Sequence, residues 1–151
     1  MVIKTKITNG GKLPYRAHKT DGGADLYAAK FENEEGRVAI IAPFGKLLID
    51  TGVSMEIPVG YIGDVRPRSS LFFKKGLICA GTIDSDYRGN IKVCLRNLTT
   101  EPVSITLGER VAQLCIMPVE LCHFEEVESL SRTERGTGGF GSTGTGKEDE
   151  K

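Results

Sequence analysis

The chain has 151 residues and a mass of 16.4 kDa, enough for one domain with a substantial core. Lysine and arginine total 20, as do aspartate and glutamate, so the formal net charge is zero at pH 7. We expect no direct nucleic-acid binding, because it would need a surplus of cations against phosphate. No apolar run approaches the ~20 residues of a membrane span, and the segment MVIKTKITNGGKLP lacks a signal-peptide core. These features predict a cytoplasmic protein that does not contact a membrane.

Glycine and proline, 19 and 6 residues, are spread along the chain and leave few intervals long enough for a helix. Composition therefore disfavours an all-α fold and a doubly wound α/β fold. The cysteines form no CxxC pair and have no histidine at a ligand spacing, so we interpret them as reduced thiols rather than zinc ligands. They are Cys79, Cys94, Cys115 and Cys122.

Short strands are predicted where apolar and polar residues alternate, in residues 53–57, 91–96 and 103–107. Glycine and proline turns separate these segments, a pattern typical of a β-sandwich or jelly roll. Before them, Asp25 lies among small residues in GGADLY, residues 22–27. An acidic side chain in that setting can hold Mg²⁺ directly or through water.

One short helix is predicted over residues 71–75. Ser69 and Ser70 can cap its start, and Gly76 can end it. Arg68 stands just before it, so a guanidinium, two hydroxyls and backbone amides could form a phosphate cradle. A capped helix with a surface arginine is the alternative.

Segment 77–95 is expected to form a strand, a loop and a second strand, and unpaired backbone groups of such a hairpin could read a planar base. Asp84 in the loop could activate water. Asp86 is better explained as a turn residue. Tyr87 is either part of the core or a platform beneath a sugar, and an ordinary hairpin remains an alternative for the whole segment.

The C-terminal third contains a polar interruption and an unusual tail. Gln113 interrupts an apolar strand, so it either faces outward or lines a site. Residues 119–135 could form a helix, but we favour a strand end followed by an extended linker. The tail GTGGFGSTGTGKEDEK, from Gly136, is too poor in apolar residues to order itself, and Phe140 is its only apolar anchor.

Residues 141–147 match the opening GxxxxGK of a phosphate-binding P-loop. Glu148 stands where that motif needs a hydroxyl, and the chain ends at Lys151, so we do not predict a P-loop. The glycines still suit close approach to a bound group, and Arg135 before them can donate to phosphate. A solvated end is the alternative.

Five segments in this order resemble the trimeric dUTPases. They are GADLYA at 23–28, PRSSL at 67–71, GTIDSDYRG at 81–89, GERVAQL at 108–114 and RGTGGFGSTG at 135–144. Each motif alone is weakly specific, whereas all five in order are highly specific.

The resemblance implies an all-β fold, a distorted jelly roll of the β-clip type with one short helix, over residues 1–134. It implies a glycine-rich C-terminal arm, residues 135–151, that closes over a neighbouring subunit's site in a homotrimer. The implied reaction is hydrolysis of dUTP to dUMP and pyrophosphate with Mg²⁺. This reaction limits uracil in DNA and supplies dUMP for thymidylate synthesis.

Residue roles follow from the resemblance position by position. Asp84 orients and deprotonates the water that attacks the α-phosphorus, and Tyr87 packs under the deoxyribose. The backbone of residues 78–83 and of Lys92 reads uracil, through Gly81, Thr82 and Ile83 among others, and Asp25 contacts Mg²⁺ through water. Phe140 stacks on uracil. The phosphate-binding residues are Arg68, Ser69, Ser70, Gln113, Arg135, Gly141, Ser142 and Thr143.

Some family members place an asparagine side chain near position 78, where this chain has Ile78, so we expect no side-chain hydrogen bond to the base from there. A dCTP deaminase is the first alternative, but it needs a glutamate, and none lies between Ile83 and Val93. A regulatory protein that uses the nucleotide as a switch is the second, and such an added partner role stays open. A structural jelly-roll protein is the third, which gives no reason for an aromatic residue in a glycine-rich tail.

Overall fold

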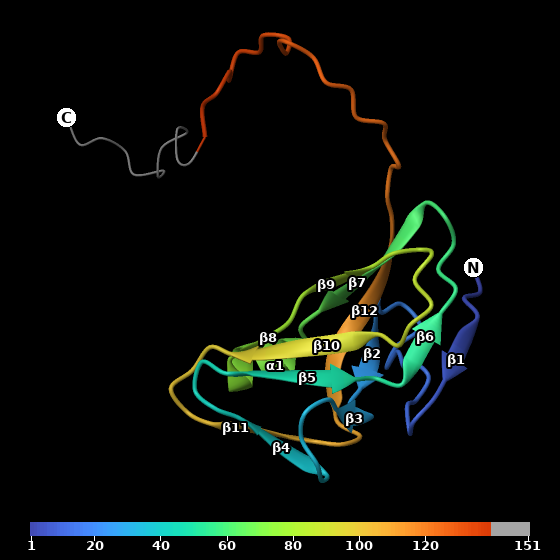
Figure 1. The fold of residues 1–151 in the computed structure, drawn as a ribbon, viewed down its shortest axis with the longest axis vertical. Helices are drawn as coiled ribbons and strands as arrows, with labels where there is room; N and C mark the ends of the chain where they lie inside the picture. The colour runs from blue at the N-terminus through green and yellow to red at the C-terminus, as the bar shows by residue number, and fades with distance from the viewer. Residues whose placement is uncertain (140–151) are drawn as a thin grey trace, which may run out of the picture. The chain divides into compact units, whose positions relative to one another are not determined.

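A computed structural model describes residues 1–139 and shows a mostly β protein with one short helix (Figure 1). The chain divides into two units, Met1–Leu121 and Cys122–Lys151. All regular elements of the described residues belong to the first unit. They are β1 (Thr5–Ile7), β2 (Gly23–Tyr27), β3 (Lys30–Phe31), β4 (Val38–Ile41), β5 (Lys46–Asp50), β6 (Val53–Met55), β7 (Tyr61–Arg66), α1 (Ser69–Lys75), β8 (Leu77–Ile78), β9 (Gly81–Ile83), β10 (Lys92–Asn97), β11 (Val103–Thr106) and β12 (Arg110–Pro118).

The first unit contains two four-stranded antiparallel sheets. One has the order β3-β5-β10-β8 and the other β2-β12-β7-β9, while β1-β6 and β11-β4 form two-stranded pairs. Figure 1 shows β10 and β5 in front of β12 and β2. Both sheets contribute to one buried cluster, with Ile49 and Leu95 from the first and Leu26 and Leu114 from the second. This two-layer arrangement confirms the predicted all-β jelly-roll class.

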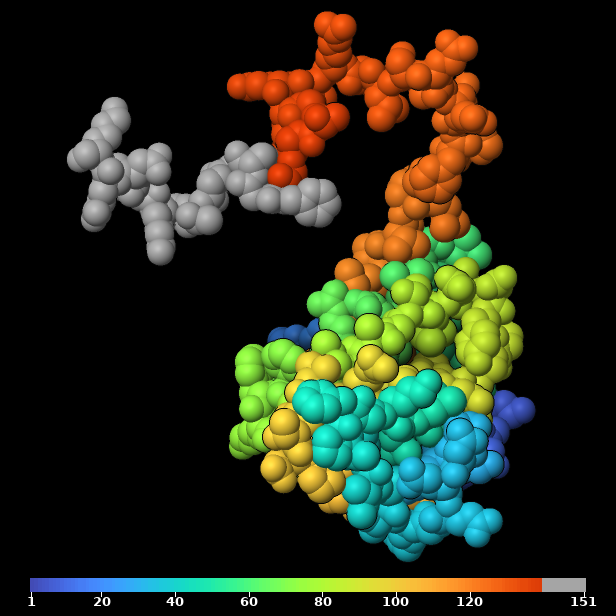
Figure 2. Space-filling view, turned by 60° about the vertical axis from the view of Figure 1, so that its left-hand side comes forward, coloured from blue at the N-terminus to red at the C-terminus, as the bar shows by residue number. Residues whose placement is uncertain are grey.

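The alternating pattern of β10 places its side chains as predicted. Val93 and Leu95 are buried, whereas Lys92 and Arg96 are exposed. The β4–β11 pair lies at the surface, and Figure 2 shows the teal surface near residue 40 beside the amber surface of residues 100–105. The strand predicted over residues 103–107 is β11. Its Ile105 side chain points inward and is fully buried.

Helix α1 ends where predicted but begins two residues earlier, at Ser69. Gly76 ends it in the left-handed conformation, with φ of 62°, as expected for a helix-ending glycine. The N-cap is Arg68, whose carbonyl accepts from the amides of Leu71 and Phe72, each at 3.0 Å. The predicted serine cap is therefore wrong, because Ser69 and Ser70 already lie inside the first turn.

Residues 77–97 do not form a simple hairpin. β8 pairs with β10, with Ile78 opposite Arg96, but β9 leaves this sheet and pairs with β7, with Ile83 opposite Gly63. The segment between β8 and β10 therefore bridges the two sheets. After β12 ends at Pro118, residues 119–139 contain no helix or strand, in agreement with the predicted extended linker. No helix within residues 1–139 is long and apolar enough to cross a bilayer. The predicted domain boundary at 134/135 stays a prediction.

Candidate active site

A hollow of about 450 Å³ gathers several of the predicted site residues, and we call it the Asp25 cleft. The strands β2 and β12 and the start of α1 bring these residues together from distant parts of the sequence. The predicted residues that line it are Asp25, Arg68, Ser69, Ser70 and Gln113. The cleft is also lined by Tyr15, His18, Asp21 and Arg110, which sequence reasoning did not single out.

Two guanidinium groups hold the carboxylate of Asp25. Arg68 Nε donates to Asp25 Oδ1 at 2.7 Å, and Arg110 Nη1 donates to Asp25 Oδ2 at 3.0 Å. The Asp25 side chain is only 15% exposed and that of Arg68 is 23% exposed, whereas that of Arg110 is 40% exposed, so the pair with Arg68 is the better shielded from water. Arg68 Nη1 also donates to Ser70 Oγ at 3.3 Å. Asp21 brings a second carboxylate to the cleft, so the two guanidiniums suit an anionic ligand through their remaining N–H donors rather than through a net positive charge.

Gln113 is held beside these groups by the pairing of β12 with β2, in which it lies opposite Asp25. Its Nε2 donates to the carbonyl of Pro67 at 2.9 Å. A Cβ added at Gly23 would lie 2.3 Å from Gln113 Oε1, so the amide occupies the space that a larger residue would take. Gln113 therefore lines the cleft rather than facing open solvent.

Arg110 and Gln113 line the same cleft although they are three residues apart on β12, a spacing that places side chains on opposite faces of a regular strand. The register with β2 shifts between Arg110 and Ala112, as in a β-bulge. The irregularity re-aims one side chain relative to the other. A two-residue periodicity cannot reveal this shift, which is why the sequence did not point to Arg110.

The loop after β9 carries the second group of predicted residues. Strand β9 consists of Gly81, Thr82 and Ile83. It is the last strand of its sheet and pairs with β7 along one edge. The backbone groups on its other edge are therefore unpaired within the sheet. Asp84 is exposed, and its carbonyl accepts from the amide of Tyr87 at 3.2 Å in a turn. The Tyr87 side chain is part of the surface, at 43% exposed.

Lys92 begins β10, where it lies opposite Asp50 of β5. Its Nζ lies 3.1 Å from Glu32 Oε1. The hydrogen bond and the charge of Glu32 raise the pKa of Lys92, so its side chain stays protonated and engaged.

None of the loop residues 81–92 lines the Asp25 cleft. Within one copy of the chain, the described site residues therefore fall into two separate groups. Arg135 belongs to the second unit, where it is exposed and its Nε donates to the carbonyl of Gly138 at 2.7 Å. Phe140, Gly141, Ser142 and Thr143 lie outside the described residues.

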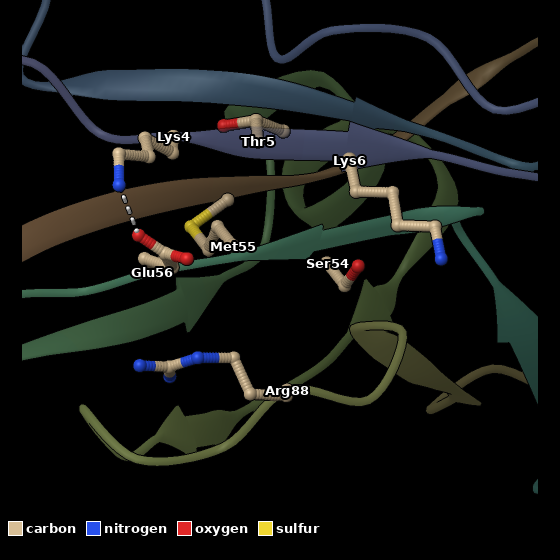
Figure 3. A pocket seen from close by; sticks show the side chains of 7 residues that line it. All are labelled: Lys4, Thr5, Lys6, Ser54, Met55, Glu56 and Arg88. Carbon is tan, nitrogen blue, oxygen red and sulfur yellow. Dashed lines mark ion pairs between the residues drawn. The ribbon is translucent and has the colours of Figure 1, made fainter.

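A different hollow, of about 360 Å³, lies along the β1–β6 pair (Figure 3). Lys4, Lys6 and Arg88 surround it, and Lys4 Nζ lies 3.1 Å from Glu56 Oε2. It contains none of the predicted site residues.

A sequence model of the dUTPase family matches residues 9–144. The chain belongs to the dUTPase family. Relatives named deoxyuridine 5′-triphosphate nucleotidohydrolase support this assignment. The one from Corynebacterium diphtheriae is 48% identical over 136 residues, 87% of this chain and 85% of the relative. The one from Corynebacterium glutamicum is 50% identical over 136 residues, 87% of each chain.

Solved dUTPase structures share the fold. The Staphylococcus bacteriophage 80alpha dUTPase with dUpNHpp is 29% identical to this chain, with a TM-score of 0.84 over 95% of this chain and 98% of that one. A mutant dUTPase from phage phi11 of S. aureus matches with a TM-score of 0.74 and 25% identity over 85% of this chain and 98% of that one. Its structure is described as revealing the coordination of a structural Mg(II) ion.

The dUTPase described here offers Mg²⁺ a partial set of ligands. Residues 1–139 contain no group of three or more His, Cys, Asp or Glu side chains that could enclose a metal ion. Asp25 and Asp21 each line the cleft with one carboxylate. Mg²⁺ keeps several waters and is commonly bound by one or two carboxylates together with substrate phosphates. The donor set therefore fits an ion contacted through water and carried by a phosphate ligand, rather than one held by the protein alone.

Proposed function

We propose that this protein hydrolyses dUTP to dUMP and pyrophosphate at a site built from the Asp25 cleft of one copy and the loop after β9 of another. The observation that carries the proposal is the Asp25 cleft itself. There Arg68, Ser69, Ser70 and Gln113 stand together around a shielded carboxylate. Membership of the dUTPase family supplies the substrate class.

In this proposal the cleft holds the triphosphate. The guanidinium of Arg68, the hydroxyls of Ser69 and Ser70 and the amide of Gln113 donate to phosphate oxygens. Asp25 keeps Arg68 and Arg110 in place through the two hydrogen bonds to its carboxylate. Such preorganised donors stabilise charge that develops during the reaction. Asp25 would contact Mg²⁺ through water when the ion is bound with substrate, and the ion would supply neutralisation of phosphate charge.

Asp84 is the proposed general base. Its carboxylate accepts a proton from water while the water oxygen bonds to the α-phosphorus. The bond from the α-phosphorus to the bridging oxygen breaks on the opposite side, and pyrophosphate leaves. The exposed position of Asp84 in one copy means that another copy must cover it to exclude bulk water.

The loop after β9 is proposed to select deoxyuridine. The unpaired edge of β9 and the backbone of Lys92 offer donors and acceptors to uracil, which would mismatch cytosine. Tyr87 beneath the sugar would leave no room for a ribose 2′-hydroxyl. The C-terminal arm is proposed to complete the site. Arg135 would contact the γ-phosphate and Phe140 would stack on uracil. The phosphates would be surrounded by Gly141, Ser142 and Thr143.

A homotrimer with shared sites is the assembly proposed here. Support comes from the separation of the two groups of residues, because none of the loop residues 81–92 lines the Asp25 cleft of the same copy. A closed rotational assembly brings different surface patches of identical subunits together at each interface. The cytoplasmic location remains part of this proposal.

Pyrophosphate release measured with dUTP, dTTP, dCTP and UTP, each with and without Mg²⁺, tests the function. Of the four nucleotides, we expect only dUTP to give efficient release of pyrophosphate. We expect that release to become slower when Mg²⁺ is chelated. Ammonia release from dCTP would instead support the deaminase alternative. Equal release from all four nucleotides would contradict base and sugar selection by the loop.

A further inference from the structure

The loop that carries Tyr87 is tied to the body of the protein through Asn90. Tyr87 Oη donates to the backbone carbonyl of Asn90 at 3.1 Å. The Asn90 side chain then reaches two other elements. Its Nδ2 donates to Asp50 Oδ2 and to Thr8 Oγ1, each at 3.1 Å. These bonds join the end of β5, the segment after β1 and the loop.

Asp50 is a buried charge that the proposed chemistry does not use. It is 7% exposed, and its Oδ1 accepts from the amide of Gly52 at 2.7 Å. Its other oxygen accepts from Asn90, and no cation forms an ion pair with it within residues 1–139. A buried carboxylate costs free energy unless its hydrogen bonds are satisfied. The hydrogen bond from Asn90 therefore stabilises both the charge and the position of the loop.

Gly89 shows how closely Tyr87 is folded against this anchor. A Cβ added at Gly89 would lie 2.3 Å from Tyr87 Oη and 2.5 Å from the ring carbon that bears it. The ring therefore lies in space that only glycine leaves open. Because 43% of Tyr87 is exposed, core packing does not fix the ring, and the bond to Asn90 supplies that restraint.

We propose that Asn90, anchored by Asp50 and Thr8, is a positioning residue that fixes the ring of Tyr87 and thereby sets the discrimination between dUTP and UTP. This inference rests on the proposed function, in which Tyr87 lies beneath the sugar. A ring that can tilt away opens space for a 2′-hydroxyl. Loss of the anchor should therefore raise turnover of UTP relative to dUTP, instead of lowering both equally.

A charge swap between Asp50 and Asn90 provides the test in the full-length protein. N90D places a second carboxyl group against Asp50. Because two such groups can share a proton near neutral pH, the dUTP to UTP ratio is measured over a range of alkaline pH, where loss of that proton leaves like charges that repel and release the loop. In the double variant D50N:N90D, the new amide at position 50 can still accept from Gly52 through its oxygen and can donate to the new carboxylate at position 90. The measurement is the ratio of kcat/KM for dUTP to that for UTP. We expect N90D to lower this ratio about ten-fold, roughly the value of one hydrogen bond to a charged group, and the swap to restore most of it.

Tyr87→Phe is a second variant that does not depend on how well N90D folds. It removes only the hydroxyl that donates to Asn90, and it lies at the surface, so we expect a folded protein with a lowered dUTP to UTP ratio. An unchanged ratio in Tyr87→Phe would overturn the inference. The inference would also be overturned if N90D had the same dUTP to UTP ratio as the wild type. It would be overturned too if the folded double variant D50N:N90D did not regain the ratio that N90D had lost.

Failure of the proposed function can be told apart from failure of the anchor. If the proposed function is wrong, the wild-type protein releases no pyrophosphate from dUTP. If Tyr87→Ala changes the ratio while N90D and Tyr87→Phe do not, the sugar platform stands and the anchor is rejected.

Discussion

Asp84 and Asp86 lie two residues apart in the same exposed loop, yet only Asp84 is proposed to act on water. Asp84→Asn should lower kcat by about 10² to 10⁴, because an amide cannot accept the proton. Binding should persist, since the phosphate donors lie in the Asp25 cleft. Stopped-flow turnover of dUTP and calorimetric binding of a non-hydrolysable analogue measure the two effects.

Asp86→Asn is the matched control for this substitution. It removes the same charge from the same loop, so it reports the general electrostatic effect of a carboxylate there. Asp86→Asn should leave kcat within a few-fold of the wild type. Normal turnover in Asp84→Asn, or an equal loss in both variants, would reject Asp84 as the base.

Cys79 offers a residue-scale prediction about stability. Burial, and to a lesser extent the nearby Cys94 thiol, raises the pKa of Cys79 from 9.0 to about 11. Between these values the unfolded chain releases a proton that the folded protein retains, so the free energy of unfolding falls as pH rises. Cys79→Ser removes this dependence. Over pH 8.5 to 10.5 we expect the wild type to lose about 1 to 2 kcal/mol more than the variant.

Urea unfolding at several pH values measures this difference. Cys122→Ser serves as the control, because Cys122 is exposed. Identical pH slopes in wild type and Cys79→Ser would contradict the raised pKa. Other titrating groups affect both proteins alike and cancel in the comparison.

At the scale of elements, the pairing of β2 with β12 sets the position of Gln113. Gly23→Ala places a methyl group where Gln113 Oε1 now lies, at 2.3 Å, so the amide must move away from the carbonyl of Pro67. We expect KM for dUTP to rise roughly three- to ten-fold, the effect of one weakened phosphate hydrogen bond, with little change in the melting temperature.

Gly22→Ala is the control, since a Cβ there meets nothing within 4 Å. Steady-state kinetics and thermal melts of the two variants separate displacement of Gln113 from a general effect of alanine on the strand. A similar KM in both variants would mean that Gln113 does not contact substrate from this position.

The sequence predicted elements well where the decisive signals were local. Alternation located β10 and β11, and Gly76 marked the end of α1. Two features depended on long-range pairing and were missed. β9 pairs with β7 instead of continuing a hairpin, and the register shift after Arg110 turns that side chain into the Asp25 cleft. Neither a sheet partner nor a bulge leaves a periodic trace in the chain.

The candidate site was predictable to a similar extent. Family motifs in the correct order pointed to Asp25, Arg68 and Gln113, which the structure brings to one cleft. The hydrogen bonds from Arg68 and Arg110 to Asp25 could not be inferred, because they join residues far apart in sequence. The serine cap failed because Arg68 takes the N-cap position with its backbone carbonyl, which places Ser69 and Ser70 inside the first turn.

At the scale of the whole molecule, the proposal requires that the Asp25 cleft and the loop of Asp84 act together although no residue of that loop lines the cleft in one copy. Co-expression of Asp84→Asn and Arg68→Ala subunits tests this requirement directly. The first subunit has an intact cleft and a disabled loop, whereas the second has the reverse. Each homo-oligomer should be weakly active.

Mixed oligomers should regain activity if each site takes its cleft and its loop from different subunits. With random mixing, roughly a quarter of the sites combine two intact halves. Two affinity tags isolate mixed assemblies, and sedimentation gives their subunit number, which we expect to be three. If both halves belonged to one subunit, every site in the mixture would carry a damaged half, and activity would stay at the level of the separate variants.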